Sequence, residues 1–251
     1  MRGAPLHITV LLTAAATLLA LPQEPPDPGP ELIQEIAAKA EEFRIARVQY
    51  TYRQTMIFQE LDVRGGEVGH YREVRDIIFN PDQERTEVLV GRPERQLRNM
   101  RLTEEDFRDI REVKPFVLTR GELPRYQVRY QGREVVDGTE CYVLHVKPRQ
   151  VLDGMRFFDG QIWVSVKDRQ IVRAAGQPVP QIHRRGGENL FPHFTTVYRP
   201  IDGKYWFPVR TLADDTIPFR SGPQRVRLVV RYDDYKRFTA DSTVQFESPK
   251  P

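Results

Sequence analysis

The feature that most constrains this fold is the long alternation of apolar and polar residues. From residue 48 to residue 59, bulky apolar side chains recur at alternate positions, with Gln, Thr and Arg between them. A period of two is typical of a strand with one apolar and one polar face. The same pattern returns near the C-terminus. The apolar sets are Val48, Tyr50, Tyr52, Met56 and Phe58 in the first segment, and Val226, Leu228, Val230 and Tyr232 in the second.

Further strand-like segments are separated by short turn sequences. Asp137-Gly138 and Asp202-Gly203 are strong hairpin signals. About nine to eleven strands in hairpin order predict a mainly β fold, with a curled antiparallel sheet or an incomplete β-barrel rather than a parallel α/β sheet. The other expected strands are 71–79, 85–90, 126–136, 140–146, 157–166, 170–174, 194–198 and 205–212.

Two helices are expected beside the sheet. Apolar residues at helical spacing predict a helix from Pro30 to Ala46, with Pro30 at its first position. Thr103 followed by Asp106 resembles a capping box and predicts a short helix from Glu104 to Glu112. No repeat of fixed period accompanies these segments, so we expect one β-rich domain.

The N-terminus is predicted to be an export signal. Residues 8–21 form an apolar run of 14 residues, whereas a bilayer-spanning helix needs about 20. We therefore expect a signal peptide at 1–23, cleaved between Ala20 and Gln23, and a Pro-rich leader at 24–30. The single domain is expected at 31–247, with a tail at 248–251. The mature protein is expected to be soluble and periplasmic or secreted.

Charge and cysteine content exclude several classes of protein. The 38 basic and 35 acidic residues give a formal net charge of only +3, which argues against a dedicated nucleic-acid binder. The single cysteine, Cys141, excludes an intramolecular disulfide framework and a Cys-based zinc cage.

The histidines give no recognisable metal motif. His183 and His193 flank a basic, Gly-rich loop, and Glu188 is the third ligand that a metal site there would use. This spacing matches no known ligand pattern, so we predict neither a metal nor a cofactor. Arg184 to Gly187 offer guanidinium groups and free amides to an anion, but a solvated loop is the simpler interpretation.

No catalytic constellation is visible either. Cys141 and His145 share a strand face but lie about 13 Å apart along it, so Cys141 is expected to be a small buried residue. Each of the acidic pairs, Asp214-Asp215 and Asp233-Asp234, would point to opposite faces of a strand. Asp214-Asp215 is expected in a loop after the strand 205–212. A catalytic pair of carboxylates could still be formed by two acidic residues from different loops, and this alternative remains open.

The residues that stand out are apolar and aromatic. Much of this set must be ordinary core, yet a curled sheet of about ten strands encloses more width than its own side chains easily fill. We therefore predict an apolar cavity lined by alternate strand residues. The expected lining residues are Tyr50, Tyr52, Met56, Phe58, Tyr205, Phe207, Leu228 and Val230.

Several segments carry a family resemblance. The chain resembles the outer-membrane lipoprotein-sorting (LolA/LolB-like) superfamily, and more narrowly a group of uncharacterised secreted bacterial proteins within it. Trp163 is expected to be buried in a strand pair beside a turn at Asp159-Gly160. The resemblance is carried by Asp168 and by the segments 115–116, 159–164, 171–173, 188–192, 205–208, 213–215 and 232–238.

The resemblance implies a function without catalytic residues. In this superfamily an incomplete barrel receives acyl chains on its concave apolar face under helical lids, which Pro30–Ala46 and Glu104–Glu112 would supply. It implies a non-enzymatic periplasmic carrier or binder of lipid or acylated protein, with lipoproteins or a membrane protein as partners. A regulatory module that senses the cell envelope is the alternative. A hydrolase using Asp214, Asp215, His183 or His193 is the third hypothesis.

Overall fold

The computed structural model describes residues 29–79, 84–103, 106–107, 118–152, 155–184 and 187–237. The predicted signal peptide, most of the leader and the tail lie outside these ranges. In the described residues, no helix is both long and apolar enough to span a membrane.

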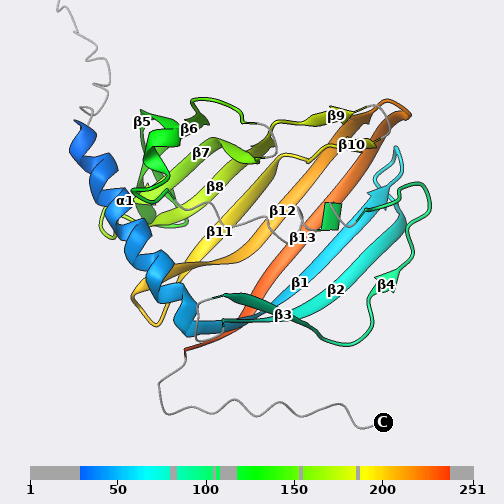
Figure 1. Ribbon diagram of the computed structural model, residues 1–251, viewed down its shortest axis with the longest axis horizontal. Coiled ribbons are helices and arrows are strands. Elements are labelled where there is room, and N and C mark those ends of the chain that lie inside the picture. Colours follow the sequence, from blue (N-terminus) through cyan, green and yellow to red (C-terminus); the bar gives the residue numbers. More distant parts are fainter. Residues whose placement is uncertain are drawn as a thin grey trace, which may run out of the picture.

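One curled antiparallel sheet of eleven strands dominates the molecule (Figure 1). Its order is β3-β2-β1-β13-β12-β11-β8-β7-β6-β5, and β4 adds to β2. This confirms the mainly β prediction. The strands are β1 (Tyr50–Leu61), β2 (Glu67–Phe79), β3 (Arg85–Leu89), β4 (Glu94–Arg95), β5 (Tyr126–Val136), β6 (Thr139–Pro148), β7 (Phe157–Ser165), β8 (Ile171–Val179), β11 (Phe194–Ile201), β12 (Tyr205–Phe219) and β13 (Gly222–Arg237).

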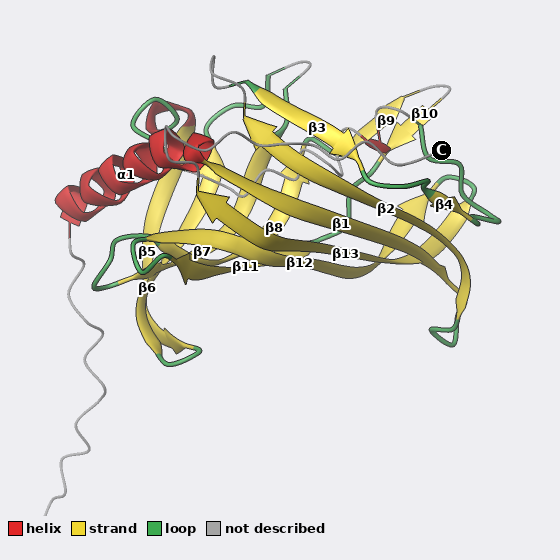
Figure 2. Cartoon of the chain, turned by 90° about the horizontal axis from the view of Figure 1, so that it is seen from below, coloured by secondary structure: helices red, strands yellow, loops and turns green. Residues whose placement is uncertain are grey.

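The sheet is curved and open. Its path ends at β3 on one side and β5 on the other, so it forms an incomplete barrel. Figure 2 shows helix α1 (Gly29–Ala46) over the concave side at one end, with the small sheet of β9 (Ile182–Arg184) and β10 (Gly187–Asn189) over the other. Single 3₁₀ turns, η1 (Arg47–Gln49) and η2 (Leu123–Arg125), lead into β1 and β5.

Helix α1 matches the predicted Pro30–Ala46 segment to within one residue. It buries Leu32, Ile36 and Phe43 against the sheet. Arg169, after β7, donates to Glu35 at 2.7 Å and ties the exposed side of the helix to the same end of the sheet. The helix thus covers part of the concave face, as expected for a covering element.

The two faces of the sheet bury different clusters. The large cluster lies on the concave side with Leu32 and Ile36 of α1. A small second cluster contains Cys141, Val143 and Trp163. Ile162, the neighbour of Trp163, belongs to the large cluster, and adjacent strand residues point to opposite faces. Trp163 therefore lies on the convex side and is 9% exposed, which confirms its predicted burial.

Two predicted details of the strands are wrong. Asp159 and Gly160 form no turn but lie inside β7, where Gly160 pairs with Gly176 of β8. A Cβ at Gly160 would stand 2.3 Å from the Ala175 carbonyl oxygen, so this approach requires glycine. Asp214 and Asp215 follow no strand end, because β12 continues to Phe219.

The predicted second helix is described only at its start. Thr103 and Asp106 exchange the capping bonds, with the Asp106 amide donating to Thr103 Oγ1 at 3.2 Å and the Thr103 amide to Asp106 Oδ2 at 2.7 Å. Asp106 and Phe107 are helical, and the remainder of Glu104–Glu112 lies outside the described ranges.

Candidate functional site

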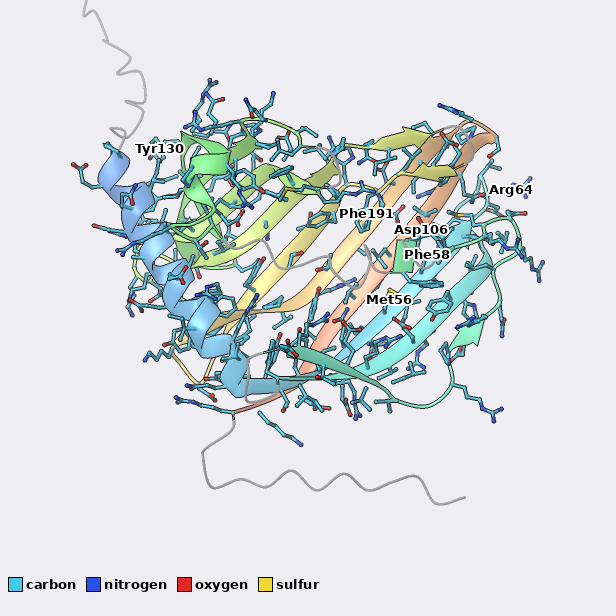
Figure 3. All side chains as sticks on the ribbon, in the orientation of Figure 1. Met56, Phe58, Arg64, Asp106, Tyr130 and Phe191 are labelled. Carbon is cyan, nitrogen blue, oxygen red and sulfur yellow. The ribbon has the colours of Figure 1, made fainter. Side chains whose placement is uncertain are left out.

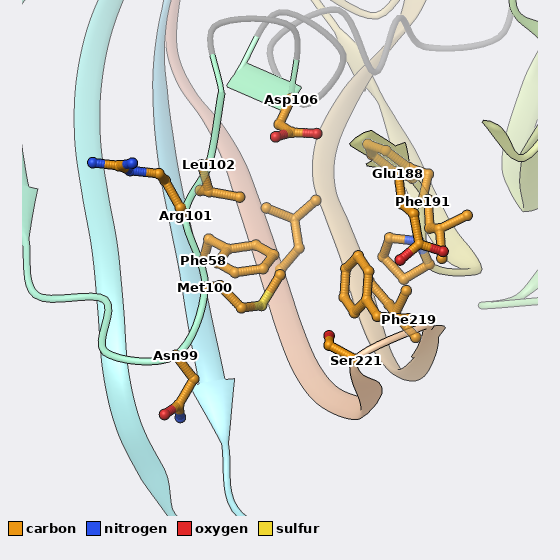
Figure 4. A pocket seen from close by; sticks show the side chains of 14 residues that line it. Phe58, Asn99, Met100, Arg101, Leu102, Asp106, Glu188, Phe191, Phe219 and Ser221 are labelled. Atoms are coloured by element: carbon orange, nitrogen blue, oxygen red, sulfur yellow. The ribbon is translucent and has the colours of Figure 1, made fainter. Parts of the chain in front are cut away.

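A cavity of about 200 Å³ lies between the concave face and two covering segments (Figure 4). Strands β1, β12 and β13 form its floor. Residues 99–102 and Asp106 form one wall, and residues 188 and 190–192 form the other. The lining residues are Phe58, Asn99, Met100, Arg101, Leu102, Asp106, Glu188, Leu190, Phe191, Pro192, Ile217, Phe219, Ser221 and Leu228.

Strand alternation supplies the floor. Phe58 of β1 and Leu228 of β13 are register partners, and both are nearly fully buried. Ile217 and Phe219 stand two residues apart on β12, so they share a face. These four side chains give the cavity an apolar base.

A buried carboxylate holds the first wall in place. Glu60 follows Phe58 on the concave face and is fully buried. Its oxygens accept hydrogen bonds from three successive backbone amides, those of Arg98 at 2.8 Å, Asn99 at 3.0 Å and Met100. Bonds from amides to a charged acceptor are stronger than neutral ones. Glu60 therefore fixes the segment that places Met100 and Leu102 over the cavity.

Replacing Glu60 with alanine is expected to lower the free energy of unfolding by about 3 kcal/mol, because three amides lose a buried charged acceptor. Glu60→Gln keeps one acceptor oxygen and should lose less. Urea denaturation measures both. Glu41→Ala, which removes an exposed pair with Arg44 at 2.6 Å, should change stability by less than about 0.5 kcal/mol. Equal effects of Glu60→Ala and Glu41→Ala would contradict this role.

A glutamine holds the second wall. The Phe191 amide donates to Gln181 Oε1 at 2.7 Å, and Gln181 Nε2 donates to the carbonyl oxygens of Phe191 at 3.1 Å and Pro178 at 2.9 Å. Near the same wall, Glu188 accepts from the Arg220 amide at 2.9 Å. The Phe191 ring is thereby presented to the cavity from a segment that contains no long strand.

A buried polar network lies on β2, the strand next to β1. Glu73 of β2 is buried and accepts from Tyr71 Oη at 2.9 Å and from two nitrogens of Arg75 at 3.1 Å. Burial and the bond to Glu73 raise the pKa of Tyr71 to about 12. Since Glu73 faces Met56 in the register, this network limits the apolar surface on that side.

The predicted lining residues separate into several groups. Phe58 and Leu228 line the cavity, while Met56 and Val230 are fully buried register partners beside them. Met56 and Phe58 lie close together on β1 in Figure 3. Tyr52 stacks on Tyr235 with ring centroids 5.1 Å apart.

The other predicted residues lie towards the end of α1. Tyr50 and Phe207 form a separate buried cluster with Phe43, and Tyr205 is half-buried beside it. The alternation that begins with Tyr205 and Phe207 is interrupted on β12, because Val197 pairs with Arg210 and Tyr198 with Pro208. That register shift leaves Val209 as an extra residue.

The acidic and histidine candidates form pairs. Asp214 and Asp215 point to opposite faces as predicted, with Arg227 donating to Asp214 at 2.6 Å. Asp215 accepts from the His193 amide at 3.0 Å and contacts His193 Nδ1 at 3.1 Å. Burial alone would raise the pKa of Asp215, but the bonds from His193 and Thr216 lower it.

The remaining candidates show no catalytic arrangement. His193 is bonded through its ring to Asp215 alone within the described part of the chain. His145 contacts Asp159 at 3.5 Å rather than Cys141, and Asp234 adopts a positive φ of 56° within β13. Across the described ranges, no group of three His, Cys, Asp or Glu residues is arranged to hold a metal. The side chains of His183 and Arg184, and residues Arg185 and Gly186, lie outside what the structure describes.

Cys141 is expected to be inert to thiol reagents in the folded protein. It is fully buried on the convex side, and burial raises the pKa of its thiol to about 11. Because the thiolate is the reactive form, labelling by a disulfide reagent at pH 8 should be negligible until denaturant is added. Rapid stoichiometric labelling of the native protein would show that the site is open.

Comparison with known proteins finds solved structures that are similar to this chain at low sequence identity. No family model and no curated protein matches this chain. A DUF1329 family protein from Desulfovibrio piger is 14% identical with a TM-score of 0.44, covering 84% of this chain and 94% of its own. A LolA superfamily protein from Nitrosomonas europaea is 18% identical with a TM-score of 0.36, covering 82% and 94%.

Other similar structures are a lipoprotein-sorting protein domain and a chain of the MucA/MucB complex. A putative outer membrane lipoprotein-sorting protein domain from Vibrio parahaemolyticus is 11% identical with a TM-score of 0.37, covering 83% of this chain and 95% of its own. A chain of the MucA/MucB complex of Pseudomonas aeruginosa is 12% identical with a TM-score of 0.26, covering 82% and 100%.

Proposed function

We propose that this protein is a non-enzymatic binder or carrier of acyl chains in the periplasm, with a lipid or an acylated protein as its ligand. The observation that carries the proposal is the cavity whose floor contains Phe58, Ile217 and Leu228. Ligand pockets are concave and mostly apolar, with few polar groups. Nine of the fourteen lining residues of this cavity are apolar, and five are polar or charged: Asn99, Arg101, Asp106, Glu188 and Ser221. The apolar side chains would contact an acyl chain, and the polar ones would contact its headgroup.

The energetics support an acyl chain as the ligand. Each methylene group removed from water gains about 0.8 kcal/mol, so a soluble carrier must offer an apolar lining of comparable area. Two aromatic rings, Phe191 and Phe219, stand opposite Met100 and Leu102 across the cavity in Figure 4. A chain lying between these walls would exchange water for carbon contacts along both sides.

Native mass spectrometry of the protein purified from a periplasmic extract tests the proposal. We expect additional masses that correspond to lipid, and we expect organic extraction to remove them. Saturable binding of a fluorescent fatty-acid probe to the stripped protein should follow. A single unliganded mass together with no saturable probe binding would exclude the carrier function.

A second candidate is a module that binds an extended segment of an envelope protein. The observation that favours it is β5, an eleven-residue strand that ends the sheet path. Within the described ranges β5 pairs only with β6, and an open strand edge is a template for pairing with another chain. A pull-down from a membrane extract that recovers one protein while the purified module carries no lipid would favour this function.

A further inference from the structure

Two arginines stand directly opposite each other on the convex face of the sheet. Arg210 of β12 and Arg231 of β13 are register partners, as are their neighbours Thr211 and Val230. Thr211 and Val230 are fully buried, and Val230 belongs to the large concave cluster. Adjacent strand residues point to opposite faces. Arg210 and Arg231 therefore project from the convex side, where both are exposed.

The charge of this pair is not balanced within the sheet. Neither guanidinium group forms a hydrogen bond or an ion pair with a described residue. The acidic residues that share this face on the two strands lie beside other arginines: Asp233 faces Arg53 in the register, and Asp214 accepts from Arg227. Like charges directly opposite in a sheet, with Cβ atoms about 5 Å apart, are destabilising. An external anion is therefore the partner that would neutralise the pair.

A row of aliphatic side chains lies beside the two arginines. Leu212, two residues along β12, pairs with Val229 of β13, which pairs with Ile57 of β1. Leu212 is 36% exposed, and the other two are half-buried. In Figure 2 helix α1 and the small sheet of β9 and β10 lie on the concave side, and no described element covers β12 and β13 on the convex side. Both the charged pair and the aliphatic row are thus open to a partner.

We propose that this convex face, formed by Arg210, Arg231, Leu212, Val229 and Ile57, binds an acidic amphipathic helix of a partner protein. The guanidinium fork matches a carboxylate, so an acidic side chain of the partner bridges the two arginines. Residues two apart on a strand are separated by about 7 Å, and residues three or four apart on a helix by about 5–6 Å. A helix with a carboxylate and an aliphatic side chain at that spacing reaches both rows together.

The aliphatic row favours a protein over a lipid surface as the partner. Interfacial binding buries apolar side chains about 5–10 Å into the bilayer boundary. Val229 and Ile57 are half-buried within the sheet, so they contact a surface laid on them but do not enter a bilayer. This face and the cavity lie on opposite sides of the sheet. A partner bound here leaves the cavity open, and the docking does not rest on the proposed function.

Fluorescence anisotropy with a designed peptide tests the docking. The peptide has about eighteen residues, enough to form an isolated helix, with Glu and Leu three or four residues apart on one face. We expect saturable binding by the full mature chain, weakened by added salt. Arg210→Glu and Arg231→Glu should each lower the affinity about tenfold, and Leu212→Asp about fivefold. A peptide with Lys in place of Glu should bind the double arginine variant and not wild type.

Two variants elsewhere on the sheet are matched controls. Arg129 of β5 is exposed and forms no ion pair with a described residue. It projects from the same convex face, because its register partner His145 lies between the concave residues Leu144 and Val146. Arg129→Glu should bind the peptide within about twofold of wild type. The same holds for Val135→Asp, at a position that is 71% exposed.

A stability measurement separates a binding role from a structural one. Arg231→Gln should lower the affinity for the acidic peptide about fivefold. The same variant should unfold at the same urea concentration as wild type or at a higher one, because it removes one of two like charges that face each other. A lower urea midpoint together with unchanged peptide affinity would assign Arg231 a structural role.

Three results would overturn the proposal. One is the absence of saturable binding of the acidic peptide to wild type. The second is an equal loss of affinity in Arg129→Glu and Arg231→Glu, which would indicate general charge attraction. The third is binding to protein-free anionic vesicles that Leu212→Asp abolishes, which would assign the face to a membrane. Arg231→Glu should leave the affinity for the fatty-acid probe unchanged, so this face is tested independently of the carrier function.

Discussion

Replacing Phe58 with aspartate is expected to lower the affinity for a fluorescent fatty-acid probe at least tenfold. The ring is 3% exposed and forms the floor of the cavity with Leu228. A carboxylate at this position would lie among apolar side chains, and its burial has a high free-energy cost. Tenfold corresponds to about 1.4 kcal/mol, a small fraction of that cost.

Suitable controls follow from the register of β1. Thr55 lies on the opposite face of the strand, next to Arg231, so Thr55→Asp should bind within about twofold of wild type. Arg53 is less suitable, because it forms a two-bond pair with Asp76 at 2.8 and 3.0 Å.

A second variant separates loss of binding from unfolding of the sheet. Met100→Asp changes the half-buried covering segment instead of the sheet, and it should also lower binding about tenfold. Far-UV circular dichroism must match wild type in every variant that is scored. Unchanged binding in both Phe58→Asp and Met100→Asp would exclude this cavity as the ligand site.

Replacing Trp163 with alanine is expected to lower the free energy of unfolding by about 3–5 kcal/mol, the usual range for a buried large aromatic residue. The indole packs with Cys141, Val143 and Val172 on the convex face. Its Nε1 donates to Glu134 Oε2 at 2.6 Å, and the Arg173 guanidinium lies 5.8 Å from the ring centroid.

Denaturant unfolding of three variants resolves these contributions. Trp163→Phe keeps most of the packing but loses the hydrogen bond to Glu134. The loss of this bond should lower the free energy of unfolding by about 1 kcal/mol, in addition to the effect of the smaller ring. Val135→Ala, at an exposed position, should stay within about 0.5 kcal/mol of wild type. A loss below 1 kcal/mol for Trp163→Ala would show that the convex cluster contributes little to stability.

The strands and their faces were predictable from the sequence. Val226, Leu228, Val230 and Tyr232 are all buried, as their alternation requires. A two-residue period is a local property of an extended chain, and it fixes a face wherever one side of a sheet is covered. Exceptions to the alternation carry information as well. Glu60 occupies a concave position where the pattern requires an apolar residue, and its carboxylate holds the cavity wall.

The composition of the cavity was only partly predictable. Phe58 and Leu228 were among the expected lining residues, but Met100 and Leu102 lie in a polar stretch with no period of two or 3.6 to indicate them. Leu190, Phe191 and Pro192 belong to a segment that carried the family resemblance, without any signal of a wall. Sequence patterns report burial, and burial alone does not separate a cavity lining from a packed core.

The sequence by itself determined a curled antiparallel sheet with a covering helix, because alternation, hairpin turns and caps depend on neighbouring residues. Only the tertiary structure decided which part of the concave face of the sheet remains a cavity. That choice depends on the curvature of the sheet and on two covering segments that are distant in sequence. Residues 99–102 with Asp106, and residues 188–192, face each other over β1, β12 and β13. Such contacts are set by hydrogen bonds between specific side chains and backbone groups, and no local period encodes these bonds. The amides of Arg98 and Asn99 donate to Glu60, 38 and 39 residues away, and the Phe191 amide donates to Gln181, 10 residues away.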